Sequence, residues 1–214
     1  MDSLRHLEEI FAKFPGIGPR QAKRFVYYLL NKSSASIEEL AHLIKEVKKS
    51  TSECGQCHRF FAHNSNYKSI SSTAKSLISD SCSICSDKSR DQSTLMVVAR
   101  DSDFETVEKS GSFTGLYFIL GGTVPVLDKE PEKRIRIKKL LEYVSNSENI
   151  KEIILSLNAT PDGDHTENIV KEGIHKILKN KNVKISVLGR GLSTGSELEY
   201  VDRETIKSAL QNRK

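Results

Sequence analysis

The chain of 214 residues contains no run of eighteen apolar residues. Its first residues, MDSLRHLEEIFAKF, have the pattern of an amphipathic helix and lack a signal-peptide core. Both absences predict a soluble, cytoplasmic protein with no membrane partner. Hydrophobic residues make up only 37% of the chain and mean hydropathy is -0.42, which predicts two or three small modules and not one large domain.

Acidic residues are slightly too few to balance the basic ones. The 28 Asp and Glu face 33 Lys and Arg, so the net charge is +5 and the sequence pI is about 8.9. A nucleic-acid partner is compatible with this mild excess, but charge alone does not require one.

No cysteine is left unpaired in the sequence pattern. The four cysteines form two CxxC pairs, Cys54 with Cys57 and Cys82 with Cys85. In a cytoplasmic chain this spacing predicts one tetrahedral structural Zn²⁺ per chain, because two short hairpins can each present two thiolates to one ion. The alternatives are a redox dithiol, chance pairing, or a site in which His58 or His63, in the Ser- and Asn-rich interval 58–81, replaces a thiolate. That interval, longer than in a compact finger, predicts an extended surface loop.

The first fifty residues carry three apolar stripes at helical spacing, which predict three short helices. Ser36 with Glu39 has the pattern of a capping box at the start of the third helix. The stripes are Leu4, Leu7, Ile10, Phe11 and Phe14; Ala22, Phe25, Val26, Leu29 and Leu30; and Ile37, Leu40, Ala41, Ile44 and Val47.

The break between the first two helices is FPGIGPRQAKRF. Gly16 and Gly18 favour a tight turn whose backbone N–H groups are open, and such groups at a helix N-terminus attract phosphate. Basic residues follow the turn: Arg20, Lys23 and Arg24. The pattern resembles a helix-hairpin-helix motif, which predicts DNA binding by all five residues. The alternative is a Gly/Pro turn between core helices with a solvated basic face.

From Ser93 onward short apolar runs alternate with helical patterns, which predicts an α/β layer of parallel strands with ligand-facing loops at the strand C-termini. The predicted strands are 94–99, 115–120, 152–157 and 183–188, and the predicted helices are 104–109, 134–144 and 165–179.

Four motifs in order resemble the bacterial RecR recombination family: FPGIGPRQAKRF, the paired CxxC finger, an α/β part with GLYFILGG and NATPDGDHT, and the ending GRGLSTGSELEYVDRETIKSAL. The resemblance implies an α/β fold class with four parts. They are a helical helix-hairpin-helix domain (1–50), a zinc finger with a long insertion (51–92), a Toprim-like domain (93–190) and a C-terminal helical assembly segment (191–214).

A catalytic Toprim domain holds Mg²⁺ with a glutamate after its first strand and a D-x-D pair after a later one. Here Ala99 stands at the first position, while Asn158 and Thr160 stand at the D-x-D positions. We therefore expect no catalytic residues. A shift of two residues would bring Asp101 and Asp103 near the strand end, which keeps a magnesium site as an alternative.

The acidic residues near these strand ends are expected to contact a partner protein instead: Asp101, Asp103, Asp162 and Asp164. The loop 189–197 resembles a phosphate-binding turn, but it lacks the Gly-Lys-Ser/Thr of a Walker A motif, which argues against nucleotide binding.

The resemblance implies a mediator of DNA recombination and repair. Such proteins form ring-like homo-oligomers, from dimer to tetramer, that bind single- and double-stranded DNA and act with RecO or RecF to load RecA onto single strands. Two alternatives come from other classes: a Toprim-type Mg²⁺-dependent nuclease or primase-like enzyme, and a zinc-stabilised adaptor that does not touch DNA.

Overall fold

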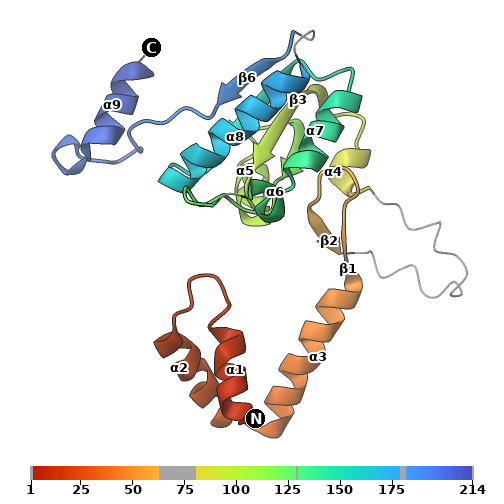
Figure 1. Ribbon diagram of the computed structural model, residues 1–214, viewed down its shortest axis with the longest axis vertical. Coiled ribbons are helices and arrows are strands. Elements are labelled where there is room, and N and C mark those ends of the chain that lie inside the picture. Colours follow the sequence, from red (N-terminus) through yellow and green to blue (C-terminus); the bar gives the residue numbers. More distant parts are fainter. Residues whose placement is uncertain (1, 63–80, 129, 179–181, 214) are drawn as a thin grey trace, which may run out of the picture. The chain divides into compact units, whose positions relative to one another are not determined.

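The computed structural model describes residues 2–62, 81–128, 130–178 and 182–213 (Figure 1). Most of the expected surface loop between the cysteine pairs, and His63 with it, lies outside these residues. Contacts divide the described chain into two units. One comprises residues 2–52 with Ala62, and the other comprises 53–61 and everything from Ser81 onward.

The N-terminal unit consists of the three expected helices, α1 (Ser3–Phe11), α2 (Pro19–Leu30) and α3 (Ser34–Ser50). α2 buries Ala22 and Val26, whereas α3 buries none of its residues. The predicted capping box at Ser36 is wrong. Ser33 caps α3 instead, because its hydroxyl already accepts the backbone N–H of Ser36 at 3.3 Å.

The paired cysteines lie around two short strands and one helical turn at the start of the second unit. Strands β1 (Thr51–Glu53) and β2 (Phe60–Ala62) form a two-stranded sheet around the first CxxC, and α4 (Ser83–Ser86) carries the second. The backbone N–H of Ile119 donates to the Cys57 carbonyl at 2.9 Å, so the finger is attached directly to the large sheet.

The large sheet has four parallel strands in the order β4-β3-β5-β6. Their bounds are Asp91–Val98 for β3, Gly115–Ile119 for β4, Glu152–Ser156 for β5 and Lys184–Val187 for β6. All four predicted strands are therefore confirmed to within a few residues. The second half of β3, Leu95 to Val98, is apolar and fully buried, because both faces of the sheet are covered there.

Helices cover the sheet on both faces (Figure 1). α7 (Ile137–Asn146) and α8 (Pro161–Ile177) pack through Leu140, Val144, Val170 and Ile174 against one face. α5 (Asp101–Ser110) packs against the other through Phe104, whose ring meets that of Tyr117 edge-on. A short α6 (Pro131–Arg134) precedes α7. The expected parallel α/β fold is confirmed.

The C-terminal segment contains a 3-10 turn, η1 (Leu198–Tyr200), and a last helix, α9 (Arg203–Gln211). Asp202 caps α9 by accepting the backbone N–H groups of Glu204 and Thr205, both at 3.0 Å. No residue of α9 is buried within the chain. Among the described residues, none of the helices has the length and apolar character that crossing a membrane would require.

Candidate nucleic-acid interface and metal centre

The turn between α1 and α2 leaves backbone donors open. Gly16 has φ +76°, in the left-handed region that favours glycine, and the Ile17 N–H closes the turn onto the Phe14 carbonyl at 3.0 Å. Gly18 is the N-cap of α2 and offers no side chain, so the first-turn N–H groups lack a side-chain partner. A Cβ placed on either glycine would meet nothing within 4 Å. The geometry therefore leaves room for an anion such as a phosphate.

The three predicted cations lie on the exposed surface of α2, immediately after this turn. Arg24 donates through Nη1 to Gln21 Oε1 at 3.3 Å. Within the described residues, no carboxylate lies within ion-pair distance of Arg20, Lys23 or Arg24. A guanidinium or ammonium without a carboxylate partner is free to bind a phosphate without first breaking an internal ion pair.

One feature of this surface was missed by the sequence reasoning. Tyr27 lies on the same face of α2 as the three cations, because it follows Lys23 by four residues and Arg24 by three. The signal was present in the sequence as an aromatic residue at helical spacing from the basic ones.

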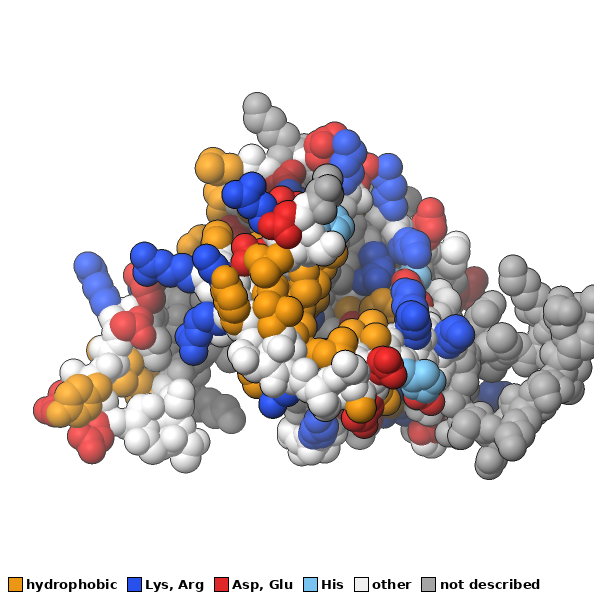
Figure 2. Space-filling view, turned by 90° about the horizontal axis from the view of Figure 1, so that it is seen from below, with side chains coloured by type: hydrophobic (Ala, Val, Ile, Leu, Met, Phe, Trp, Pro, Cys, Tyr) orange, Lys and Arg blue, Asp and Glu red, His pale blue; other side chains and the backbone are white. Residues whose placement is uncertain are grey.

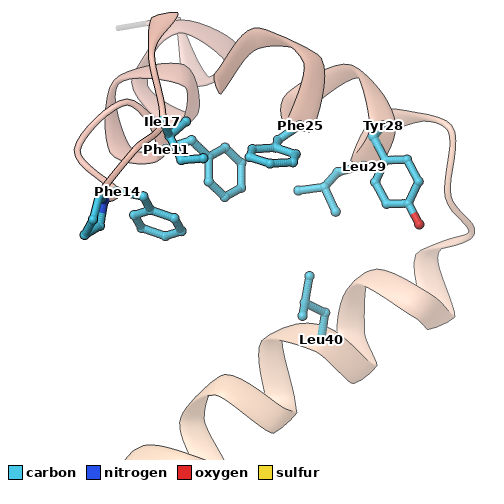
Figure 3. Close-up of a pocket in the computed structure, with 8 residues that line it drawn as sticks. Phe11, Phe14, Ile17, Phe25, Tyr28, Leu29 and Leu40 are labelled. Carbon is cyan, nitrogen blue, oxygen red and sulfur yellow. The ribbon is translucent and has the colours of Figure 1, made fainter. Parts of the chain in front are cut away.

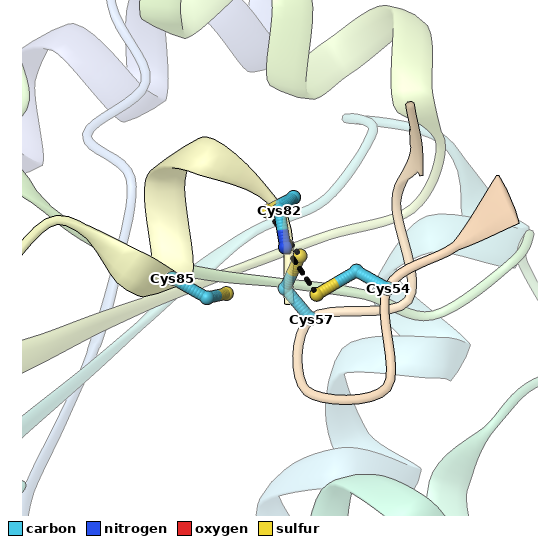
Figure 4. A group of neighbouring side chains, drawn as sticks. All are labelled: Cys54, Cys57, Cys82 and Cys85. Atoms are coloured by element: carbon cyan, nitrogen blue, oxygen red, sulfur yellow. Dashed lines mark hydrogen bonds between the residues drawn. The ribbon is translucent and has the colours of Figure 1, made fainter. Parts of the chain in front are cut away.

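The four predicted metal ligands come together (Figure 4). Their sulfur atoms all lie within 4.8 Å of one another, and Cys57 Sγ is 3.6 Å from Cys82 Sγ. Four ligands about 2.3 Å from a zinc ion at tetrahedral angles lie about 3.8 Å apart. Cys54, Cys57 and Cys82 are fully buried. The cluster thus has the donor type, number and spacing of a closed structural metal site.

The cluster is also held by backbone geometry. Cys82 donates its backbone N–H to Cys54 Sγ at 3.4 Å, the dashed line in Figure 4, and the Cys54 N–H donates to the Arg59 carbonyl at 2.8 Å. Hydrogen bonding between thiols lowers the pKa of Cys54 and raises that of Cys57. Four neighbouring thiolates would repel one another, so full ionisation of the cluster requires a bound cation.

His58 is not among the candidate ligands. Its Nδ1 lies 2.7 Å from Glu53 Oε1, and its ring meets Phe118 edge-on with 5.2 Å between ring centroids. Burial lowers the pKa of His58. The residue has φ +61°, the only positive φ of a non-glycine residue in the described parts of the chain, so it serves the tight turn after Cys57.

The strand ends where a Toprim enzyme would hold Mg²⁺ are built without the required carboxylates. Ala99 is fully buried, and its carbonyl accepts the Gly121 N–H at 2.9 Å. Thr160 caps α8 by accepting the Gly163 N–H at 3.2 Å. Asn158 lies against the same turn, since a Cβ on Gly163 would be 1.9 Å from the Asn158 carbonyl oxygen. In the described chain, no group of three or more His, Cys, Asp or Glu ligands gathers here.

The four acids expected to contact a partner each have an intramolecular contact. Asp101 Oδ1 accepts the Phe60 N–H at 2.9 Å, and Asp103 Oδ2 accepts the Arg100 N–H at 2.9 Å at the start of α5. Asp162 Oδ1 accepts the Val126 N–H at 3.1 Å.

The fourth acid, Asp164, accepts a charged hydrogen bond. Arg190 donates to its Oδ1 at 2.6 Å, and this contact raises the pKa of the arginine. The Asp164 side chain is 53% exposed and therefore still accessible.

Comparison with known proteins finds three family models along the chain. The models described as "RecR, helix-hairpin-helix", "Toprim domain" and "RecR, C-terminal" match residues 4–48, 93–189 and 191–214. Among curated relatives, the chain is similar to proteins named "Recombination protein RecR". That of Lactobacillus acidophilus is 31% identical over 210 residues, covering 98% of this chain and 96% of the relative. That of Legionella pneumophila (strain Philadelphia 1) is 35% identical over 213 residues, covering 100% and 96%.

Proposed function

The chain belongs to the RecR family of recombination proteins, and from this we propose that it is a DNA recombination and repair mediator with no catalytic step of its own. The observation that carries the proposal is the open turn at Gly16 and Gly18 followed by Arg20, Lys23 and Arg24, which have no carboxylate partner among the residues that the structure describes. Backbone donors at the helix start and free cations just beyond them suit a sugar-phosphate backbone. In this proposal both single- and double-stranded DNA bind there.

We propose that the cysteine cluster holds one structural Zn²⁺ per chain. The four sulfurs would complete a tetrahedral shell and leave no open position for a substrate, so the ion would supply folding free energy and no chemistry. Bound there, it would hold β1, β2 and α4 together beside the sheet.

Partner contacts with RecO or RecF are assigned in this proposal to the acidic loops, above all to Asp164. That side chain is the most accessible of the four acids, and its single arginine partner, Arg190, could exchange for a basic group of another protein. The contacts of Asp101, Asp103 and Asp162 with backbone N–H groups give those three residues a structural role as well.

The N-terminal unit exposes two apolar surfaces, which supports self-association. One is the groove lined by Phe11, Phe14, Pro15, Ile17, Phe25, Tyr28, Leu29 and Leu40 (Figure 3). The other is the apolar face of α3, where four residues of the predicted stripe and the neighbouring Leu43 are exposed: Ile37, Leu40, Leu43, Ile44 and Val47. Apolar side chains gather over these helices in the space-filling view (Figure 2). We propose that a second copy of the chain covers both surfaces, as a step towards a ring-like oligomer.

Replacing Leu40 and Ile44 together with glutamine tests this assembly. Each leucine or isoleucine buried in an interface contributes about 1.5–3 kcal/mol, so the double variant is expected to weaken association by roughly 10²- to 10⁴-fold. Molar mass from light scattering over a range of concentrations measures the effect. Glu39→Gln with Glu46→Gln on the same helix is the matched control and should leave the mass unchanged. An unchanged mass for the Leu40/Ile44 variant would place the interface elsewhere.

RecA loading tests the function as a whole. RecA filament formation on single-stranded DNA coated with single-stranded-DNA-binding protein is expected to accelerate when this chain and a RecO partner are added together. The variant in which Arg20, Lys23 and Arg24 are all replaced by alanine should not accelerate RecA filament formation. Failure of the wild-type chain in this assay, with Mg²⁺-dependent DNA cleavage or synthesis that Asp162→Ala abolishes, would instead support the enzymatic alternative.

A further inference from the structure

Two tyrosines lie exposed next to the basic residues of α2. Tyr27 is 48% exposed and Tyr28 59% exposed, which leaves much of each ring facing solvent. Together with the cations they line one shallow groove along the helix, formed by Arg20, Lys23, Arg24, Tyr27, Tyr28 and Asn31. Nothing in a phosphate-binding surface requires an aromatic ring in this position.

The two rings differ in their surroundings. Tyr28 also lines the apolar groove proposed for self-association, so its exposure has a second explanation. Tyr27 lines the basic groove and is not among the residues that line the apolar one. Lys23 Nζ lies 5.9 Å from the Tyr27 ring centroid, and Asn31 Nδ2 donates to the Tyr27 carbonyl at 2.7 Å at the end of the helix. Tyr27 is thus an exposed ring on α2 that shares its groove with three cationic side chains, Arg20, Lys23 and Arg24.

Distances along the helix match a bound single strand. Seven residues separate Arg20 from Tyr27, which corresponds to about 10 Å along the helix axis. A stacked strand rises about 3.4 Å per nucleotide. A strand that runs along the helix axis with one phosphate beside Arg20 therefore brings a base about three nucleotides further on to the Tyr27 ring.

We propose that Tyr27 stacks on a base of single-stranded DNA and gives this surface its preference for single strands. The inference rests on the proposed function, since the cations must first hold the backbone. Aromatic rings stack on any base because every base has a π-face, whereas the base faces of a duplex are already covered by neighbouring base pairs. The cations bind both forms of DNA through phosphate, and Tyr27 adds affinity for the unpaired form alone.

Binding of three probes tests the proposal: oligothymidine, an abasic oligomer of equal length, and a duplex. Tyr27→Ala and Tyr27→Leu are each expected to weaken oligothymidine binding by about fivefold or more, because a stacked base contributes at least about 1 kcal/mol. Tyr27→Phe keeps the ring and should bind like the wild type. Binding of the abasic oligomer and the duplex should not change, nor should the salt dependence, because no charge is removed.

A spectroscopic probe follows from the composition, since the chain has no tryptophan. Tyr27→Trp introduces a single indole at the proposed stacking position, and oligothymidine is expected to quench its fluorescence while the abasic oligomer does not. Tyr200→Trp, at a residue that is 79% exposed in the C-terminal segment, is the matched control and should show no quenching.

The outcomes separate this inference from the function on which it rests. If Tyr27→Phe weakens oligothymidine binding as much as Tyr27→Ala does, the contact is made by the hydroxyl and not by the ring. If Tyr27→Leu binds oligothymidine like the wild type, the contact is a simple apolar one. Either result overturns stacking. A loss of equal size on the abasic oligomer overturns it as well. If instead the Arg20/Lys23/Arg24 variant binds all three probes normally, the DNA surface itself has been misassigned. Circular dichroism and molar mass establish that each variant is folded and assembled.

Discussion

Replacing Cys82 with serine is expected to reduce bound zinc from about one ion per chain to nearly none. Cys82 is fully buried and its sulfur lies 3.6 Å from Cys57 Sγ. Its replacement therefore removes one of the four sulfur ligands and opens the coordination shell. Structural zinc contributes about 10–16 kcal/mol in small metal-dependent modules, as much as the whole stability of an ordinary domain. The segment formed by β1, β2 and α4 should therefore lose its fold, with a marked fall in Tm. Elemental analysis and thermal unfolding measure the two effects.

Ser83→Ala is the control for this experiment. Ser83 lies between the two cysteines of the second pair, is exposed, and is not one of the four ligands. Its replacement should leave both zinc content and Tm unchanged. A wild-type chain with much less than one zinc per molecule, or a Cys82→Ser chain that retains its zinc, would contradict a closed Cys₄ site.

Removing the charges of Arg20, Lys23 and Arg24 together, as alanine, is expected to produce the second large effect. Each phosphate contact contributes about 0.7–0.9 to the slope of log affinity against log salt concentration. Loss of three contacts should reduce that slope by about 2–3 and weaken binding to single- and double-stranded DNA alike. Fluorescence anisotropy at several salt concentrations measures both quantities.

The matched control removes the same total charge elsewhere. Lys109, Lys133 and Lys138 are exposed lysines that already pair with Glu105, Glu130 and Glu132. Their replacement by alanine should lower DNA affinity far less, because a paired lysine offers less free charge to phosphate. Equal effects of the two triple variants would indicate that only net charge matters and would remove the α2 surface from the proposal.

Regular structure and metal ligands were predictable where they depend on local pattern. The strands follow from continuous apolar runs, and the cysteine cluster follows from two CxxC pairs with no thiol to spare. The cap of α3 was mispredicted because Ser33 and Ser36 are equally suitable as cap residues, and only the backbone geometry decides between them. The division of the chain near residues 50, 92 and 190 stays a prediction.

What the sequence by itself determined is which chemical groups are available. Ala99, Asn158 and Thr160 cannot supply carboxylates in any fold, so the expectation of a non-catalytic Toprim domain depended only on residue identity. Residue identity alone likewise supplies the four thiolates and the basic residues that follow the Gly16 turn.

The tertiary structure alone decided which groups meet and which surfaces stay uncovered. Asp101 accepts a hydrogen bond from Phe60, 41 residues away, and Asp162 from Val126, 36 residues away. Such contacts depend on how distant segments pack and have no local signal. The stripe of α3 indicated an apolar face in the sequence, but a periodic pattern does not identify what covers that face. Only the folded chain shows that none of the described residues buries this face of α3.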